Sequence, residues 1–318
     1  MSERALITGV AGFVGSHLAE YLLGRGLEVY GLKRKEDGID NIRSIKEDLT
    51  LISGDMNDYG SLKKALKKAE PDYIYHLAAQ AHVPTSWKTP ADTMEVNAIG
   101  TIFLLEAVRS YGCDPRIQIA GSSEEYGLIH PGELPVRETN QLRPLSPYGV
   151  SKVAQDLIGW QYYKSYGLKT VRTRAFNHTG PRSGVGFVAS NFANQIAEIE
   201  KGVNEPVMHV GNLEAQRDFL DVRDVVRAYH MSLSSCDFGE AYNICAEKPR
   251  TIQSVLDILL SLSSRRDIRV ETDPERMRPL DIPVIYGSCE KFSKKTGWKP
   301  QIPFEKTMRD LLFYWRGK

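Results

Sequence analysis

Ala5-Leu6-Ile7-Thr8-Gly9-Val10-Ala11-Gly12-Phe13-Val14-Gly15 is the stretch of the 318-residue chain that decides its fold. Its first four residues form an apolar run typical of a buried strand, and residues 16–25 carry the apolar spacing of one helical face. The glycines between them repeat as Gly-x-x-Gly-x-x-Gly. Glycine lets the backbone approach a ligand closely, and a helix N-terminus presents free N–H groups. We therefore predict a strand, turn and helix that bind a dinucleotide pyrophosphate, although the spacing alone also fits a simple glycine-rich turn.

Apolar runs alternate with amphipathic stretches through the rest of the first half of the chain. We expect further strands at residues 27–32, 49–52, 73–77, 116–120 and 170–174, and helices at 59–69, 90–110 and 147–166. This alternation predicts an α/β fold, a doubly wound parallel sheet that helices cover on both faces.

The sequence changes character after Phe176, where residues 180–186 are loop-like and the strands become short and irregularly spaced. We expect a dinucleotide-binding domain over residues 1–175 and 216–250. The remaining residues, 176–215 and 251–318, are expected to form a smaller C-terminal α/β domain that binds the substrate.

Charge and hydropathy argue against several classes of protein. The 41 Lys and Arg residues nearly balance the 40 Asp and Glu residues, so the net charge of +1 attracts neither nucleic acid nor an anionic membrane. No segment approaches the roughly 18 consecutive apolar residues of a membrane span, and the start of the chain lacks the pattern of a signal peptide. We expect a cytoplasmic protein with no nucleic-acid and no membrane partner.

The cysteines and histidines give no metal signature. Cys113, Cys236, Cys245 and Cys289 are far apart with no Cys-x-x-Cys, and the seven histidines show no His-Glu-x-x-His pattern. We expect no metal site and interpret the cysteines as reduced packing residues.

The end of the second predicted strand bears on the choice of cofactor. An NAD site usually has an acidic residue there, whereas this chain has Lys33, Arg34 and Lys35. Cationic side chains suit a 2′-phosphate, so NADP(H) is favoured and NAD(H) remains possible. Asp55, after the third strand, has a carboxylate that accepts hydrogen bonds from an adenine amino group. A solvated basic turn and a helix cap are the plainer interpretations of these residues.

Tyr148 and Lys152 are four residues apart on a predicted helix and therefore share one face. A tyrosine has an ordinary pKa near 10, and a nearby ammonium group stabilises its phenolate. The pair is suited to acid/base chemistry, although an isolated pair of this spacing is more often a surface feature.

Together, the three glycines of the loop, Leu77-Ala78-Ala79-Gln80, Ser122 and Tyr148-x-x-x-Lys152 resemble the extended short-chain dehydrogenase/reductase family. The resemblance implies a Rossmann fold, with Tyr148 as general acid/base and Lys152 as the residue that tunes it and holds the nicotinamide ribose. It also implies that Ser122 hydrogen bonds to the reacting oxygen and that Asn97 is the family's helix asparagine. The residues expected at the cofactor are Gly9, Gly12, Phe13, Val14, Gly15, Lys33, Arg34, Asp55, Met56, Leu77, Ala78, Ala79, Gln80, Asn97, Tyr148 and Lys152.

Residues 175–182 and 211–219 resemble the GDP-mannose branch of this family, which implies a GDP-sugar as substrate. A diphosphate and a guanine need several hydrogen-bond donors, although any one of the arginines considered would more often be a surface ion pair. The residues expected at the substrate are His82, Ser123, Glu124, Asn177, Asn191, Val210, Arg217, Arg278 and Asp281.

Three reactions fit this resemblance. Reduction of the C4 keto group of GDP-4-keto-6-deoxy-D-mannose needs Tyr148 as acid, and the presence of Ser122 instead of threonine and the short chain favour it. A 4,6-dehydration of GDP-mannose would use Glu124 as an additional acid/base, and a 4-epimerisation would use the same triad. A Rossmann protein without chemistry is disfavoured because Tyr148 and Lys152 are both present.

The helices expected at 90–110 and 147–166 carry more apolar side chains than a monomer surface usually exposes, among them Ile102, Leu105, Val153 and Leu157. The family resemblance implies that these helices pair with their copies in a homodimer through a four-helix interface. Further association into a tetramer is left open.

Overall fold

A seven-stranded parallel sheet forms the centre of the protein, as seen in a computed structural model that describes residues 2–130, 132–277 and 282–318. The strand order is β10-β6-β5-β4-β1-β2-β3, and every neighbouring pair is parallel. The strands are β1 (Arg4–Thr8), β2 (Glu28–Lys33), β3 (Leu49–Ser53), β4 (Tyr73–His76), β5 (Arg116–Ser122), β6 (Thr170–Ala175) and β10 (Ala241–Ile244). The arrangement confirms the predicted Rossmann-type α/β fold. Strand β10 was not among the predicted strands. It lies far along the chain, after β9 and α8, and pairs with β6 at the edge of the sheet.

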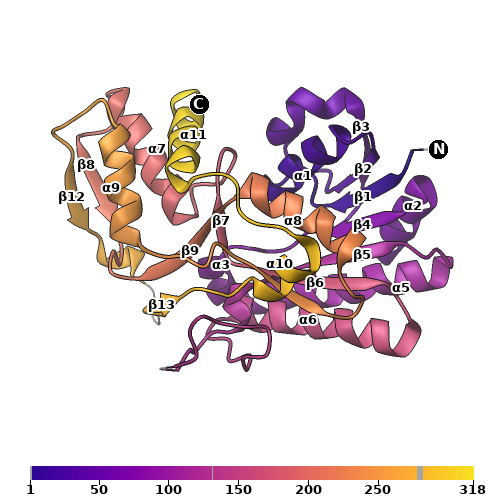
Figure 1. Cartoon of the computed structure of the whole chain (residues 1–318). Helices are drawn as coiled ribbons and strands as arrows, with labels where there is room; N and C mark the ends of the chain where they lie inside the picture. The colour runs from indigo at the N-terminus through magenta and orange to yellow at the C-terminus, as the bar shows by residue number, and fades with distance from the viewer. Residues whose placement is uncertain (1, 131, 278–281) are drawn as a thin grey trace.

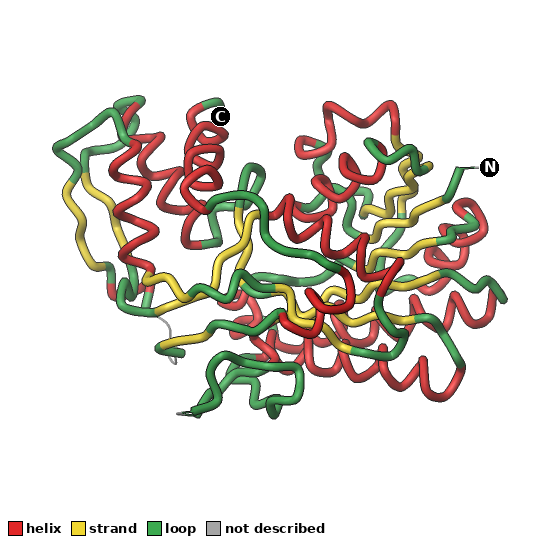
Figure 2. Tube along the Cα trace, in the orientation of Figure 1, coloured by secondary structure: helices red, strands yellow, loops and turns green. Residues whose placement is uncertain are grey.

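Helices cover both faces of this sheet because its strands are apolar on both sides (Figures 1 and 2). Ala5 and Ile7 of β1 face a core shared with α1 (Phe13–Leu23) and α8 (Val222–Ser235). Leu6 between them faces the opposite core, shared with α2 (Tyr59–Ala69), α5 (Gly100–Tyr111) and α6 (Pro147–Tyr166). The alternation of neighbouring residues between two cores fixes the register of the sheet.

The C-terminal part of the chain builds a third core beside the sheet, on the left in Figure 1. Three helices share this core, namely α7 (Val188–Glu200), α9 (Ile252–Leu262) and α11 (Phe304–Arg316). Short strands accompany them, namely β7 (Asn177–Thr179), β8 (Val207–Val210), β9 (Gln216–Asp221), β11 (Pro249–Thr251), β12 (Arg269–Thr272) and β13 (Val284–Ile285). Strand β9 lies at the centre of the connection, because it pairs with β7, β11 and β13. The exact domain boundaries stay a prediction.

The helix expected at residues 90–110 is not continuous. It consists of α4 (Pro90–Met94), a π-helical turn at Glu95–Ile99 and α5. The short helix α3 (Val83–Lys88) precedes it. The π turn carries the fully buried Asn97, and such turns are frequent at functional sites. Leu105 of α5 is also fully buried, in contrast to its predicted exposure, because it packs in the core beneath the sheet.

Other elements are short. They are the 3₁₀ turns at Asp40–Asp48, Ser123–Glu125 and Pro274–Arg276, and the helix α10 (Glu290–Thr296). None of the helices within the described residues has the length and apolar character needed to cross a membrane.

A buried hydrogen-bond chain connects β1, β4 and α5. The Thr8 hydroxyl accepts from the backbone N–H groups of Leu77 and Ala78, both at 3.1 Å, and lies 2.9 Å from Nδ1 of His76. Because this hydroxyl already accepts twice, it donates to Nδ1, which places the imidazole proton on Nε2. Nε2 lies 2.9 Å from Oγ1 of Thr101, which donates to the backbone oxygen of Asn97 at 2.6 Å. His76 is therefore held as a neutral imidazole.

We expect His76 to make folding sensitive to acid. Burial, aided by the charge of Lys152, lowers the pKa of His76 from 6.5 to about 3. Between these pH values the unfolded chain binds a proton that the folded chain resists, so the free energy of unfolding falls as the pH falls. His76→Gln should reduce this slope by up to about 1.4 kcal/mol per pH unit. Urea unfolding from pH 7 to pH 4 measures it, with the exposed His130→Gln as control; an unchanged slope in His76→Gln would contradict the assignment.

Candidate active site

A cleft of about 620 Å³ lies at the carboxyl ends of β1, β2, β3 and β4. In a doubly wound sheet this edge is where ligands bind. Many of the residues predicted to contact the cofactor line it, namely Gly9, Gly12, Lys33, Arg34, Asp55, Met56, Leu77, Ala78, Ala79 and Gln80. The turn after β1 and the segment after β4 thus line the same cleft, and their contact with a cofactor stays a prediction.

The glycines of the first turn serve different purposes. Gly9 has a φ of +72°, and a Cβ there would lie 3.0 Å from the backbone of Ala78. Gly15 lies in the first turn of α1, where a Cβ would approach the carbonyl oxygen of Gly9 to 2.2 Å. The absence of a side chain at Gly15 therefore allows α1 to pack closely against the glycine turn. Phe13 is at the start of α1, and its ring stacks on His178 at a centroid distance of 6.1 Å. Phe13, Val14 and Gly15 are not among the described residues that line the cleft.

The basic segment at the end of β2 is followed by an acidic residue, Asp37, that was not among the predicted cofactor residues. Arg34 donates to the Asp37 carboxylate from Nε at 3.1 Å and from a terminal nitrogen at 2.9 Å, and both residues line the cleft. Lys33 turns back to the carbonyl oxygen of Arg34 at 2.6 Å. This side of the cleft therefore has a cationic and an anionic group, and the two are paired. The Asp37 carboxylate follows the strand by a few residues, so a search confined to the strand end misses it.

Tyr148, Lys152 and Ser122 meet where α6 crosses the end of β5. The Tyr148 phenol is buried, and the Ser122 side chain lies close enough to influence its pKa. The Lys152 ammonium lies 5.9 Å from the centre of the Tyr148 ring and donates to the carbonyl oxygen of Ala120 at 2.9 Å and to Gln155 at 2.7 Å. The structure thus brings together all three residues of the predicted catalytic group.

The protonation states of Tyr148 and Lys152 follow from their burial. Loss of solvation raises the pKa of Tyr148 above its ordinary value of 10, and the polar side chain of Ser122 opposes this rise. Burial also lowers the pKa of Lys152 from 10.5 to about 8, although the charge of Glu125 partly counteracts it. The phenol therefore keeps its proton at neutral pH, and the ammonium remains charged until the solution becomes mildly alkaline.

Beneath this group lies a set of buried charges that the sequence did not reveal. The Glu125 carboxylate accepts from the backbone N–H of Ser122 at 2.7 Å and lies 3.0 Å from Nε of Arg174. Arg174 and Arg172 also pair with Asp156 of α6. Burial and the charge of Asp156 raise the pKa of Glu125, while Arg174 opposes the rise. Glu125 therefore holds the Ser122 backbone in place, and its carboxyl group counteracts part of the effect of burial on Lys152.

Asn97 lies outside the cleft and connects its wall to the helix of Tyr148. Its side chain accepts from the backbone N–H of Gln80 at 2.8 Å, and donates to the carbonyl oxygen of Gln80 at 3.0 Å and to Ser151 at 2.8 Å. Ser151 lies on α6 between Tyr148 and Lys152. The neighbouring Val96, and not Asn97, lines the cleft among the described residues. A direct contact between Asn97 and the cofactor stays a prediction.

The residues predicted at the substrate divide between two places. Ser123 and Glu124 follow Ser122 in a 3₁₀ turn, and the backbone N–H of Glu124 donates to the Ser122 hydroxyl at 3.2 Å. His82 hydrogen bonds with Thr85 at 2.9 Å, and its ring meets Phe187 edge-on. Asn177 lies on β7, close in sequence to the end of β6.

The other predicted substrate residues belong to the C-terminal part. Asn191 of α7 accepts from Arg276 at 3.0 Å, and Val210 ends β8 as a buried residue. Arg217 is buried and donates to the carbonyl oxygen of Ile282 at 2.6 Å. Arg278 and Asp281 lie outside the residues that the structure describes.

The chain resembles characterised proteins along its whole length. A family model described as GDP-mannose 4,6 dehydratase matches residues 6–311. The GDP-6-deoxy-D-mannose reductase of Pseudomonas aeruginosa is 31% identical over 318 residues, which cover 100% of this chain and 99% of that protein. The GDP-mannose 4,6-dehydratase of Yersinia enterocolitica is 33% identical, over 98% of this chain and 93% of that protein.

Solved structures agree with these sequence relatives. The structure of RMD from Pseudomonas aeruginosa complexed with NADPH superposes with a TM-score of 0.86 at 30% identity, over 99% of both chains. The UDP-glucose 4-epimerase of Thermus thermophilus in complex with NAD gives a TM-score of 0.88 at 32% identity, again over 99% of both chains. The protein therefore belongs to the GDP-mannose 4,6-dehydratase family of the extended short-chain dehydrogenases/reductases.

Proposed function

We propose that the protein is an NADP(H)-dependent reductase that converts the C4 keto group of GDP-4-keto-6-deoxy-D-mannose to a hydroxyl group. The observation that carries this proposal is the buried Tyr148 phenol, close enough to Ser122 for that side chain to affect its pKa and with the Lys152 ammonium 5.9 Å from the centre of its ring. A protonated phenol and a hydroxyl group that meet at one point are the two donors that a reacting carbonyl oxygen needs.

The cofactor fits the cleft chemically. The backbone at Gly9 and Gly12 has no side chain between it and the cleft, and Gly12 precedes the first residue of α1, whose free N–H groups attract a pyrophosphate. Asp55 and Met56 would lie at the adenine, and Lys33 and Arg34 at the adenosine ribose and its phosphate. The bound nicotinamide supplies the hydride for the carbonyl carbon. Leu77, Ala78, Ala79 and Gln80 form the opposite wall.

The chain's own residues supply the proton. As negative charge develops on the C4 oxygen, Tyr148 donates its proton and Ser122 hydrogen bonds to the same oxygen. Tyr148 is left as a phenolate in a buried environment, where an uncompensated anion is unfavourable. The Lys152 ammonium, held by Ala120 and Gln155, stabilises that phenolate. Glu125 keeps the Ser122 backbone fixed while the Ser122 hydroxyl group changes its hydrogen-bond partner.

The GDP-sugar substrate and the reductive direction are supported by the relatives. The Pseudomonas aeruginosa reductase aligns end to end with the chain. The sugar nucleotide would lie between the Ser122 turn and the C-terminal part, where Asn191 and Arg217 offer polar groups together with Asn177 of β7. Arg278 and Asp281 are proposed to contribute from the segment between Arg276 and Ile282.

A 4,6-dehydration of GDP-mannose is the second candidate, and one observation favours it. Glu124 lies in the turn that follows Ser122, and its negative charge adds to the effect of burial in raising the pKa of Tyr148, which supports a position near the phenol. A carboxylate in that position is suited to remove the C5 proton and protonate the leaving C6 hydroxyl group. The Yersinia enterocolitica dehydratase has comparable identity to the chain.

We also propose a homodimer through helices α5 and α6. Val150, Leu157 and Trp160 of α6 are each more than two-fifths exposed, as is Ile99 immediately before α5. Exposed apolar side chains on adjacent helices are typical of an interface. The four-helix interface expected from the sequence would cover them.

The two reactions are separated by their substrates. With GDP-mannose and no reductant we expect no product that has lost one water, and with GDP-4-keto-6-deoxymannose we expect one NADPH consumed per sugar, by mass spectrometry and absorbance. Glu124→Gln should lower the reductase rate less than tenfold, whereas it should lower a dehydratase rate by a factor on the order of 100 or more, typical of a lost acid/base group.

Tyr148→Phe should abolish either activity, and Tyr166→Phe, at an exposed position of the same helix, is its matched control. Dehydration of GDP-mannose by the unmodified protein, lost in Glu124→Gln, would overturn the reductase proposal.

Arg34 should determine the preference for NADPH over NADH. A charge-assisted hydrogen bond to the 2′-phosphate contributes about 1.5–3 kcal/mol, so Arg34→Ala should raise the KM for NADPH by about tenfold or more and leave that for NADH nearly unchanged. Arg43→Ala is a suitable control, because Arg43 also pairs with an aspartate three residues away but lies outside the residues that line the cleft. Equal effects on both cofactors would argue against a 2′-phosphate at Arg34.

Lys152 should limit the reaction at alkaline pH. Since its pKa is about 8 in the free protein, kcat/KM should decline as the pH rises past that value and the ammonium loses its proton. Lys152→Met should lower kcat/KM at pH 7 by a factor on the order of 100 or more and remove this decline. Lys164→Met, an exposed substitution on the same helix, should change neither. A decline that persists in Lys152→Met would assign it to another group.

A further inference from the structure

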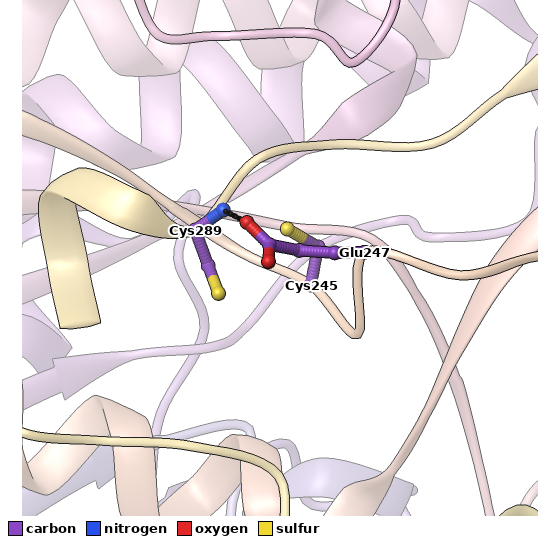
Figure 3. A group of neighbouring side chains, drawn as sticks. All are labelled: Cys245, Glu247 and Cys289. Carbon is purple, nitrogen blue, oxygen red and sulfur yellow. Dashed lines mark hydrogen bonds between the residues drawn. The ribbon is translucent and has the colours of Figure 1, made fainter.

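Two cysteines and a glutamate from separate segments meet away from the cleft (Figure 3). Cys245 follows β10 directly, Glu247 lies two residues further on, and Cys289 immediately precedes α10. The two sulfur atoms and a carboxylate oxygen all lie within 4.8 Å of one another. Both cysteines are buried and Glu247 is exposed, so the group has one side open to solvent.

Contacts within the group hold these atoms in place. The backbone N–H of Cys289 donates to Oε1 of Glu247 at 2.7 Å, and the Ser288 hydroxyl donates to the same oxygen at 3.1 Å. The Cys289 sulfur lies within 4.8 Å of the Cys245 sulfur and 3.4 Å from the Ser293 hydroxyl. Three potential ligand atoms are thus already assembled before any ion binds.

The backbone at Glu247 is held in an unfavourable conformation. Its φ is +61°, a left-handed value that a residue with a side chain rarely adopts and that costs on the order of 1 kcal/mol. The buried Asp218 carboxylate holds this turn by accepting from the N–H groups of Ala246 at 2.8 Å and Glu247 at 2.9 Å. Its second oxygen also lies 3.4 Å from the N–H of Gly287, in the segment that leads to Cys289. Asp218 therefore ties both segments together through backbone groups.

We propose that Cys245, Cys289 and Glu247 form a binding site for a thiophilic divalent cation such as Zn²⁺. Two thiolates and a carboxylate are a donor set that suits zinc, with water from the open side as the fourth ligand. Zinc–sulfur bonds of about 2.3 Å place two sulfurs somewhat less than 4 Å apart, so the group must contract by about 1 Å or less.

The role of the ion is to join two parts of the fold. Cys245 and Glu247 lie where the chain leaves the large sheet for β11, and Cys289 lies where the chain returns from β13 to α10. A cation bound to both connections would stabilise them relative to the unfolded chain, since it binds only when the three ligands are together. The site supports the structure and takes no part in the proposed reduction.

Cobalt titration of the full-length protein tests this site. The protein is kept reduced with a phosphine, stripped of metal by dialysis against a chelator, and titrated with Co²⁺. We expect one equivalent to produce thiolate-to-cobalt charge-transfer absorption and the intense visible bands of a four-coordinate site, and Zn²⁺ to abolish both. Zn²⁺ should also raise the midpoint of thermal unfolding of the unmodified protein.

Substitutions locate the ligands. Cys245→Ser and Cys289→Ser should each remove the charge-transfer absorption and the Zn²⁺-induced stabilisation, and Glu247→Gln should weaken binding at least tenfold. Cys113→Ser is the matched control, because Cys113 lies at the end of α5 and outside the group. Circular dichroism and cooperative unfolding confirm that each variant is folded. Absence of the cobalt spectrum in the reduced unmodified protein, or its persistence in the Cys245→Ser/Cys289→Ser double variant, would overturn the proposal.

Discussion

The buried hydrogen-bond chain from Thr8 through His76 and Thr101 to Asn97 is the constraint on which the active site depends. It starts at the end of β1, beside the glycine turn, and reaches the π turn before α5. From there the Asn97 side chain connects both to Gln80 and to Ser151 of α6. Because every member is fully buried, breaking one link would leave a polar group without a partner. The chain fixes the position of the helix that carries Tyr148 and Lys152 relative to the cofactor cleft.

A second constraint comes from the charges beneath the proposed catalytic group of Ser122, Tyr148 and Lys152. Buried ion pairs contribute little to stability on average, because desolvation offsets their attraction. Here the carboxylate of Glu125 holds the Ser122 backbone and sets the electrostatic environment of Lys152. The two arginines of β6 balance Glu125 and Asp156, so α6 is joined to the sheet by charge as well as by apolar packing. The arrangement explains why the acid/base pair can be buried and still include a cation.

The two parts of the molecule meet through backbone connections on either side of β9. Asp218 on this strand holds the turn after β10 and the segment before α10, so the large sheet and the C-terminal part share one buried carboxylate. Burial raises the pKa of Asp218 to about 7, and the three backbone N–H groups oppose that rise. The proposed cation site lies directly against this connection.

The sequence by itself determined the features that depend on residues close together in the chain. The glycine spacing, the alternation of strands and helices, and the four-residue separation of Tyr148 and Lys152 are local patterns, and they predicted the central sheet and a candidate site whose residues lie at the ends of its strands. Only the tertiary structure showed the pairing of Arg34 with Asp37, the Glu125–Arg174 contact, the interrupted helix at Asn97 and the meeting of Cys245 with Cys289. The physical reason is that the periodicity of a helix or strand depends on residues that are close together in the sequence. Buried polar contacts depend instead on which strands and turns become neighbours after folding.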